Sequence, residues 1–245
     1  MRSPAHLDFD VTRHPLYGPL FAQALEHLRP ILRTGGAVLD IGCGDAAKTA
    51  ALARLGAHAS GVDVNPEAIA CARALYPEID LRVGSSEGLP WADASFDAAF
   101  SCSVLQYVEP ELHLREMARL VRAGGRIALI ENLHGSPFAQ GWRVLHRALG
   151  WPYPPNMVPR RHLTLPWLRS LLVADFTEVS LDVWYLAALV PWAPRFLRRR
   201  LLGTPLPPTP PLGTDTLHRL DRWVFGHVPG AQGLGFQVVV RAVRR

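Results

Sequence analysis

The stretch AVLDIGCGDA, residues 37–46, constrains the fold more than any other part of the chain. Three apolar residues lead into Asp40, and Gly42 and Gly44 follow, separated by a single residue. Glycine allows a sharp turn at the end of a buried strand because no side chain stands in the way. The pattern therefore predicts a strand and a tight glycine turn, with the backbone of the turn close to a small ligand.

The same alternation repeats through the first half of the chain. AHASGVDV, IDLRVG, FDAAFSCS and RIALIEN have the composition of short buried strands, and helical segments lie between them. NPEAIACARALYP predicts a helix with Asn65 as its N-cap, and PELHLREMARLVRAGG predicts another that ends at Gly124 and Gly125. Strands that alternate with helices of this length pair in parallel, so we expect an α/β fold with a doubly wound sheet.

Composition restricts the classes of function. The chain is 49% hydrophobic and 19% charged, as in folded proteins rather than disordered ones. Its formal charge of +5 comes from arginine, with Lys48 as the single lysine, which we attribute to a GC-rich genome rather than to nucleic-acid binding. The three cysteines are odd in number and lack metal-ligand spacing, so we expect a reducing compartment and no metal site.

No stretch of the sequence predicts a membrane span. The longest apolar run, around WYLAALVPWA, is far shorter than the roughly 20 residues that a spanning helix needs. We therefore expect a cytoplasmic protein. The segment RFLRRRLLG indicates weak contact with a membrane surface, although a solvated helix face explains it equally well. Its arginines are Arg195, Arg198, Arg199 and Arg200.

A family resemblance rests on several motifs in order. Gly42, Gly44 and Ala47 nearly match the glycine pattern of dinucleotide-binding turns, and Asp63 follows where a carboxylate can bind ribose hydroxyls. With GVDVNPEAI, GSSEGLPWADASFDAAFSCSVLQYV and LVRAGGRIALIEN, this pattern resembles the class I S-adenosylmethionine-dependent methyltransferases over residues 37–132. The resemblance implies a mostly parallel, seven-stranded Rossmann-like sheet whose last strand, residues 233–243, runs antiparallel.

The resemblance also implies S-adenosylmethionine as cofactor and a set of contacts to it. The glycine turn would surround the methionine part, Asp63 would hold the ribose and Val64 would lie beside the adenine. Ser85 replaces the aspartate with which many relatives meet the adenine amino group, so the backbone amide of Ser86 would serve instead. The implied cofactor-binding residues are Asp40, Gly42, Gly44, Asp63, Val64, Ser85, Ser86, Glu87 and Cys102.

Candidate residues for the methyl acceptor follow the fourth and fifth strands. Gln106 and Tyr107 lie where many relatives have LHH, and His134 is our candidate for the general base that an oxygen acceptor needs, with Tyr107 as a second catalytic candidate. Trp142 and Trp184 belong to a tryptophan-rich half that predicts an apolar substrate chamber, although packing against the sheet explains the enrichment equally well.

These residues predict in-line methyl transfer to a small hydrophobic acceptor, with oxygen slightly favoured over nitrogen, sulfur or carbon. Two other functions are open. A NAD(P)-dependent oxidoreductase shares the glycine turn and the ribose acid, and a non-catalytic partner protein would keep the fold for binding alone.

We expect one domain over residues 1–245. Residues 1–34 would form an N-terminal cap with the helix PLFAQALEHLRPILR, and residues 35–132 the cofactor-binding core. Residues 133–245 would form the substrate-side half, with an insertion at 186–230 before the last strand.

Overall fold

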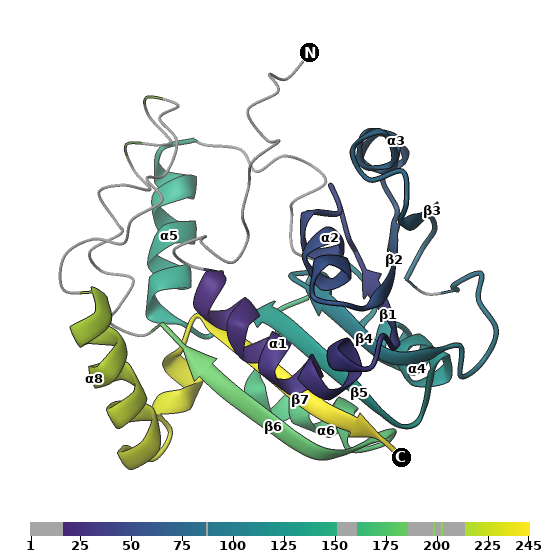
Figure 1. Cartoon of the computed structure of the whole chain (residues 1–245). Coiled ribbons are helices and arrows are strands. Elements are labelled where there is room, and N and C mark those ends of the chain that lie inside the picture. Colours follow the sequence, from purple (N-terminus) through teal and green to yellow (C-terminus); the bar gives the residue numbers. More distant parts are fainter. Residues whose placement is uncertain (1–16, 87, 151–160, 186–197, 199–201, 203–213) are drawn as a thin grey trace.

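The computed structural model describes residues 17–86, 88–150, 161–185, 198, 202 and 214–245. Its centre is one seven-stranded sheet in the order β3-β2-β1-β4-β5-β7-β6 (Figure 1). β7 runs antiparallel to both of its neighbours, and the other pairs are parallel, which confirms the predicted doubly wound sheet with an antiparallel last strand. The strands are β1 (Ala37–Ile41), β2 (His58–Asp63), β3 (Asp80–Val83), β4 (Phe96–Cys102), β5 (Val121–Asn132), β6 (Phe176–Trp184) and β7 (Gln237–Arg244).

Helices cover both faces of this sheet (Figure 1). Helices α1 and α2 cover one face, where their apolar residues form one buried cluster with the strands. Helices α4 and α6 cover the other face and form a second cluster there. The helices are α1 (Gly18–Arg33), α2 (Ala47–Arg54), α3 (Pro66–Leu75), α4 (Pro110–Leu120), α5 (Pro137–Ala148), α6 (Leu165–Leu172), α8 (Thr214–His227) and the 3-10 turn η4 (Ala231–Leu234).

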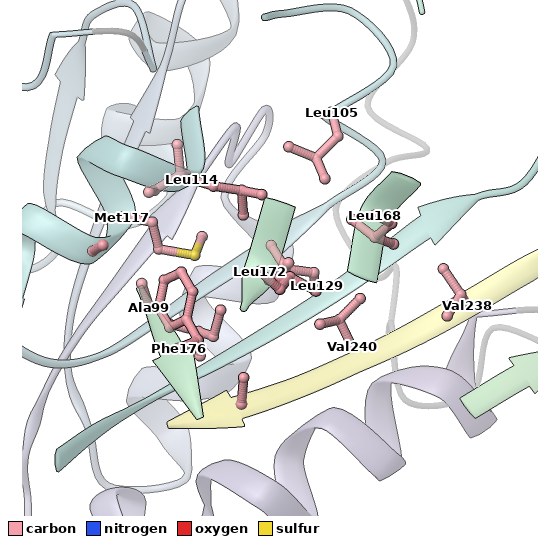
Figure 2. Close-up of a cluster of buried hydrophobic side chains, with 14 of the residues drawn as sticks. Ala99, Leu105, Leu114, Met117, Leu129, Leu168, Leu172, Phe176, Val238 and Val240 are labelled. Atoms are coloured by element: carbon pink, nitrogen blue, oxygen red, sulfur yellow. The ribbon is translucent and has the colours of Figure 1, made fainter. Parts of the chain in front are cut away.

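Strand alternation explains how one sheet serves two cores. Successive strand residues point to opposite faces, so Leu129 of β5 joins the cluster under α4 and α6 while Ile130 joins the cluster under α1. Figure 2 shows the first cluster, in which Met117 of α4 and Leu172 of α6 gather over Leu129. Each fully buried aliphatic side chain of this kind contributes about 1.5–3 kcal/mol to folding.

The predicted cap helix is confirmed as α1. Its apolar stripe is buried at Leu20, Phe21, Ala24 and Leu28, and the ring of Phe21 meets Phe100 of β4 edge to face at 5.4 Å between centroids. This stripe packs the helix against the strands of the sheet.

The predicted end of the helix before β5 is wrong. The helix stops at Leu120, and Gly124 and Gly125 lie inside β5 rather than at a helix C-terminus. A Cβ on Gly125 would lie 2.7 Å from the Asp97 carbonyl oxygen, so glycine here permits close approach of neighbouring strands. Pairing of Val121 with Phe96 in the sheet outweighs the helical pattern.

Two further features of the second half differ from expectation. The last strand begins at Gln237, because residues 231–234 form the turn η4, whereas we expected it from residue 233. α5 follows β5 directly and was not predicted. Within the predicted insertion 186–230, the structure describes residues 198, 202 and 214–230. Residues 214–227 of this last range form α8. Among the described helices, none has the length and apolarity to cross a membrane.

Candidate functional site

The glycine turn lies where β1 ends, at the edge of the sheet that also holds the carboxyl ends of β2, β4 and β5, here called the carboxyl edge. The backbone of Gly42 and Gly44 is left-handed, with φ of +78° and +56°. A Cβ on Gly42 would lie 2.2 Å from Cγ2 of Val104, whereas a Cβ on Gly44 would meet nothing within 4 Å. Gly42 is therefore required by a close contact, and Gly44 by its backbone angle beside open space.

The turn is continued by an unexpected residue. Ala46, the residue before α2, is also left-handed, with φ of 59°, and it carries a Cβ where the conformation favours glycine. The sequence pattern placed the third small residue at Ala47 instead, which begins the helix. Such strain persists when the surroundings hold it in place, and Ala46 is fully buried.

Asp63 closes the turn from the end of β2. Its Oδ2 accepts a hydrogen bond from the Gly44 amide at 2.8 Å, and its Oδ1 accepts one from the Asn65 amide at 2.9 Å. A carboxylate has about four lone-pair sites, so two remain for a ligand hydroxyl. Asn65 caps α3 as predicted, accepting from the amides of Glu67 and Ala68.

Asp40 lies beneath the turn and is 1% exposed. Its Oδ2 accepts a hydrogen bond from the Thr49 hydroxyl of α2 at 2.7 Å, which ties the end of β1 to that helix. Burial raises the pKa of the Asp40 carboxyl to about 6, although the Thr49 hydrogen bond and the charge of Lys48 oppose the rise. Asp40 thus shapes the turn from below.

The predicted adenine side lies after β2 and β3. Val64 directly follows Asp63 and is 74% exposed, the highest exposure among the large apolar side chains of the described residues. Ser85 is exposed, while the Ser86 hydroxyl is buried and finds no hydrogen-bond partner among the described residues. Glu87 lies outside the described residues. The apolar Val64 and the unpartnered Ser86 fit a planar ligand with polar edges, such as a purine.

A cluster of polar side chains lies at the end of β4, and the sequence did not predict that they meet there. Burial raises the pKa of the Cys102 thiol to about 11, although the charge of Lys48 opposes this, so the thiol stays protonated at neutral pH. Burial and the nearby Cys102 raise the pKa of the Tyr17 phenol, while hydrogen bonds with Ser103 and Gln237 oppose the rise. Tyr17 and Gln237 come from opposite ends of the chain, which is why local motifs missed them, whereas Cys102 is one of the predicted cofactor-binding residues.

The sequence signal for Lys48 is that it is the single lysine and lies just after the glycine turn. Burial acts to lower its pKa, but Cys102, Asp40 and Tyr17 outweigh burial and raise it. The ammonium therefore stays charged beside the methionine side of the predicted cofactor site.

His134 and Gln106 lie on the predicted acceptor side, and the segment of residues 161–163 forms backbone hydrogen bonds with both. The Arg161 amide donates to the Gln106 carbonyl at 3.2 Å, and the His134 amide donates to the Leu163 carbonyl at 3.2 Å. The His134 ring meets His162 edge to face at 4.8 Å between centroids. The structure thus brings these two predicted residues to one place.

The electrostatic state of His134 bears on its predicted role as a base. Burial, with the charges of His162 and Arg143, lowers its pKa to about 4. The imidazole is therefore neutral at pH 7 and can accept a hydrogen bond, but it binds a proton weakly. Tyr107, the second catalytic candidate, is half-buried, and its amide donates to the Val104 carbonyl at 2.8 Å.

The structure describes only some of the tryptophans and arginines of the second half for which a role was predicted. The Trp184 indole donates to Gln23 of α1 at 2.8 Å and packs against Tyr185, so it belongs to the core under α1. Trp142 lies in α5. Arg198 is exposed, and the other three arginines of the predicted membrane contact, Arg195, Arg199 and Arg200, lie outside the described residues. The described residues include no cluster suited to hold a metal ion.

Comparisons with known proteins agree with this geometry. Residues 39–129 match the family model described as a methyltransferase domain. The chain is 31% identical to an uncharacterized methyltransferase of Mycobacterium tuberculosis over 56% of this chain and 50% of that protein. It is 34% identical to a ubiquinone biosynthesis O-methyltransferase of Xanthomonas axonopodis over 62% of this chain and 64% of that protein. The matches thus span half to two thirds of the relatives' lengths.

A solved structure supports the fold over a greater length. A geranyl diphosphate methyltransferase in complex with SAM superposes with a TM-score of 0.60 and 18% identity, covering 92% of this chain and 85% of that one. At this identity the likeness concerns the fold. Together, the comparisons show a match to a methyltransferase domain over residues 39–129 and a shared fold over most of the chain.

Proposed function

We propose that the protein transfers a methyl group from S-adenosylmethionine to a small apolar acceptor. The observation that carries this proposal is the left-handed turn at Gly42 and Gly44, held by the Asp63 carboxylate at the carboxyl edge of the sheet. Ligands of doubly wound sheets bind at this edge. The turn lies within the segment that matches the methyltransferase domain.

The residues at this edge fit the proposed cofactor. Open space beside Gly44 leaves room for the methionine part, and the two remaining acceptor sites of Asp63 suit the ribose hydroxyls. The exposed face of Val64 suits the adenine. When bound, S-adenosylmethionine supplies the activated methyl group. The carboxylates of Asp40 and Asp63 favour the positive charge of its sulfonium.

We place the acceptor on the side of Gln106, Tyr107 and His134. There the chain would hold an acceptor hydroxyl in line with the methyl group and exclude water, which alone lowers the barrier strongly. The neutral His134 imidazole would accept a hydrogen bond from that hydroxyl. The O-methyltransferase among the relatives supports oxygen as the acceptor atom, and its place in ubiquinone biosynthesis supports an apolar, quinol-like acceptor.

The first experiment is calorimetric titration of the protein with S-adenosylmethionine, S-adenosylhomocysteine and NAD. We expect micromolar binding of the first two and none of NAD. Binding of NAD alone would overturn the proposal in favour of an oxidoreductase. Absence of any binding would favour the non-catalytic alternative, which the comparisons do not support.

The second experiment concerns the acceptor. Matched pairs of apolar phenols and anilines are incubated with S-adenosylmethionine, and methylated products are measured by mass. We expect methylation of the phenol in each pair. Preferential methylation of the anilines would show that nitrogen is the acceptor atom.

A further inference from the structure

Glu131 is a buried acid that the proposed chemistry does not use. It lies one residue before the end of β5 and is fully buried. Its Oε1 accepts hydrogen bonds from the Val104 amide at 3.0 Å and the Leu105 amide at 3.2 Å, while Oε2 finds no partner among the described residues. The side chain thus binds the backbone of another segment, the turn that follows β4.

An apolar residue would be expected at this position. Leu129 and Leu133, two residues to either side of Glu131, belong to the apolar cluster under α4 and α6, which Figure 2 shows near Leu129. Substituting a leucine at 131 would leave the buried Leu105 amide and the partly buried Val104 amide without this acceptor, which is costly. The acid is therefore explained by the turn that it binds, and not by the core around it.

The bound turn contacts the glycine turn directly. Cγ2 of Val104 occupies the space above Gly42, where a Cβ would approach it to 2.2 Å. Leu105 anchors the other side of the turn in the core, since it is fully buried. Gln106 and Tyr107 follow at once on the acceptor side. The Glu131 carboxyl group thus fixes a turn that adjoins both the predicted cofactor side, at Gly42, and the predicted acceptor side, at Gln106 and Tyr107.

We propose that Glu131 is a positioning residue that holds the 104–105 turn against Gly42, and through it sets the shape of the cofactor turn and the placement of Gln106 and Tyr107. This inference rests on the proposed function. The contacts of Glu131 are with the amides of Val104 and Leu105, so we assign it a positioning role and not a catalytic one.

Two variants of Glu131 separate positioning from packing. Glu131→Gln keeps an oxygen that can accept from both amides, whereas Glu131→Leu fills a similar volume without an acceptor. We expect Glu131→Leu to weaken S-adenosylhomocysteine binding at least about tenfold, by calorimetry, and Glu131→Gln to stay within about threefold of the wild type. Hydrogen exchange at the Val104 and Leu105 amides should quicken in the leucine variant alone.

Asp97 provides the matched control. It lies at the other end of β4, is also largely buried, and accepts a hydrogen bond from the Ala37 amide at 2.8 Å. Asp97→Asn should therefore lower stability without changing cofactor affinity. Equal loss of affinity in Asp97→Asn and Glu131→Leu would overturn the inference, because it would show a general effect of destabilisation. Wild-type affinity in Glu131→Leu, or equal loss in both Glu131 variants, would overturn it as well.

A third variant decides the matter if Glu131→Leu does not fold. Val104→Ala removes the contact with Gly42 but keeps the hydrogen bonds to Glu131. We expect it to weaken S-adenosylhomocysteine binding about threefold or more while amide exchange at Leu105 stays slow. Unchanged affinity would overturn the inference. If the wild type itself binds no cofactor, the proposed function fails, and amide exchange at Val104 and Leu105 in Glu131→Leu, compared with Glu131→Gln, still tests whether the side-chain oxygen holds the turn.

Discussion

The two edges of the sheet use acidic side chains in opposite ways. At the amino edge, where β4 and β5 begin, Arg119 pairs with Asp93 at 2.7 Å and with Glu116 at 2.8 Å, and Arg122 pairs with Asp97. The Arg119 hydrogen bond lowers the pKa of Glu116. Acids at this edge join secondary-structure elements through arginine.

At the carboxyl edge the acids bind backbone amides or a hydroxyl and pair with no arginine among the described residues, whereas Asp97 of the amino edge binds both Arg122 and the Ala37 amide. Asp63 accepts from the Gly44 amide, Glu131 from two amides of the 104–105 turn, and Asp40 from Thr49. Burial raises the pKa of Asp40 and of Glu131. The difference teaches that the acids of this edge shape loops through hydrogen bonds, whereas those of the amino edge join secondary-structure elements through ion pairs with arginine.

The largest expected contrast lies between two glycines, one at each edge. Gly42 and Gly124 have similar left-handed φ angles of +78° and +75°, but a Cβ at Gly42 would lie 2.2 Å from Val104 and one at Gly124 would meet nothing within 4 Å. Gly42→Ala should cost about 2–4 kcal/mol of unfolding free energy and abolish cofactor binding, since overpacking adds to backbone strain. Gly124→Ala should cost about 1 kcal/mol. Urea unfolding and calorimetry measure both, and equal costs would contradict the close contact.

The next contrast removes one acid from each edge. Asp63→Ala should weaken S-adenosylmethionine binding by at least about 1.4 kcal/mol, or tenfold, through loss of charge-assisted hydrogen bonds. Asp93→Ala removes an acid whose side chain is 79% exposed, so it should leave binding unchanged. Calorimetric titration of the two folded variants is the test. Unchanged affinity in Asp63→Ala would remove Asp63 from the cofactor site.

The pH dependence of stability sharpens the comparison further. Burial raises the pKa of Glu131 from 4.5 to about 8, although the hydrogen bonds from Leu105 and Val104 oppose this. Between these values the folded state binds more protons than the unfolded state, so the free energy of unfolding falls as pH rises. From pH 6.5 to 8 the wild type should lose about 1.5 kcal/mol more than Glu131→Gln. Equal pH slopes in urea titrations would show that Glu131 is ionised in this range.

Local chemistry made part of the site predictable. Asp40, Gly42, Gly44 and Asp63 lie within one strand–turn–helix–strand unit, where turn residues carry their own signal, and Asn65 caps its helix for the same reason. The sheet followed from alternating strands and helices. These features depend on neighbours in the sequence, so they can be recognised without the fold.

The rest depends on contacts between distant segments. Glu131 binds amides that lie 26 and 27 residues away in the sequence. The segment IALIEN that contains it has the composition of a buried strand, so no local pattern shows what the acid binds. Tyr17 reaches Gln237 from the opposite end of the chain. The predicted helix end at Gly124 and Gly125 was wrong for the same reason. The helix ends at Leu120 because the next residue, Val121, pairs with Phe96 of β4.

The smallest expected effect concerns proton transfer at the carboxyl edge. Because its pKa is lowered to about 4 by burial, His134 cannot hold an acceptor proton well at neutral pH. Replacement of a true general base typically costs a factor of about 10²–10⁴. We expect His134→Gln, which keeps a hydrogen-bonding side chain, to lower kcat less than about tenfold with the best phenolic acceptor. A loss beyond about 10²-fold would show that His134 takes the proton, and that proximity alone does not account for the reaction.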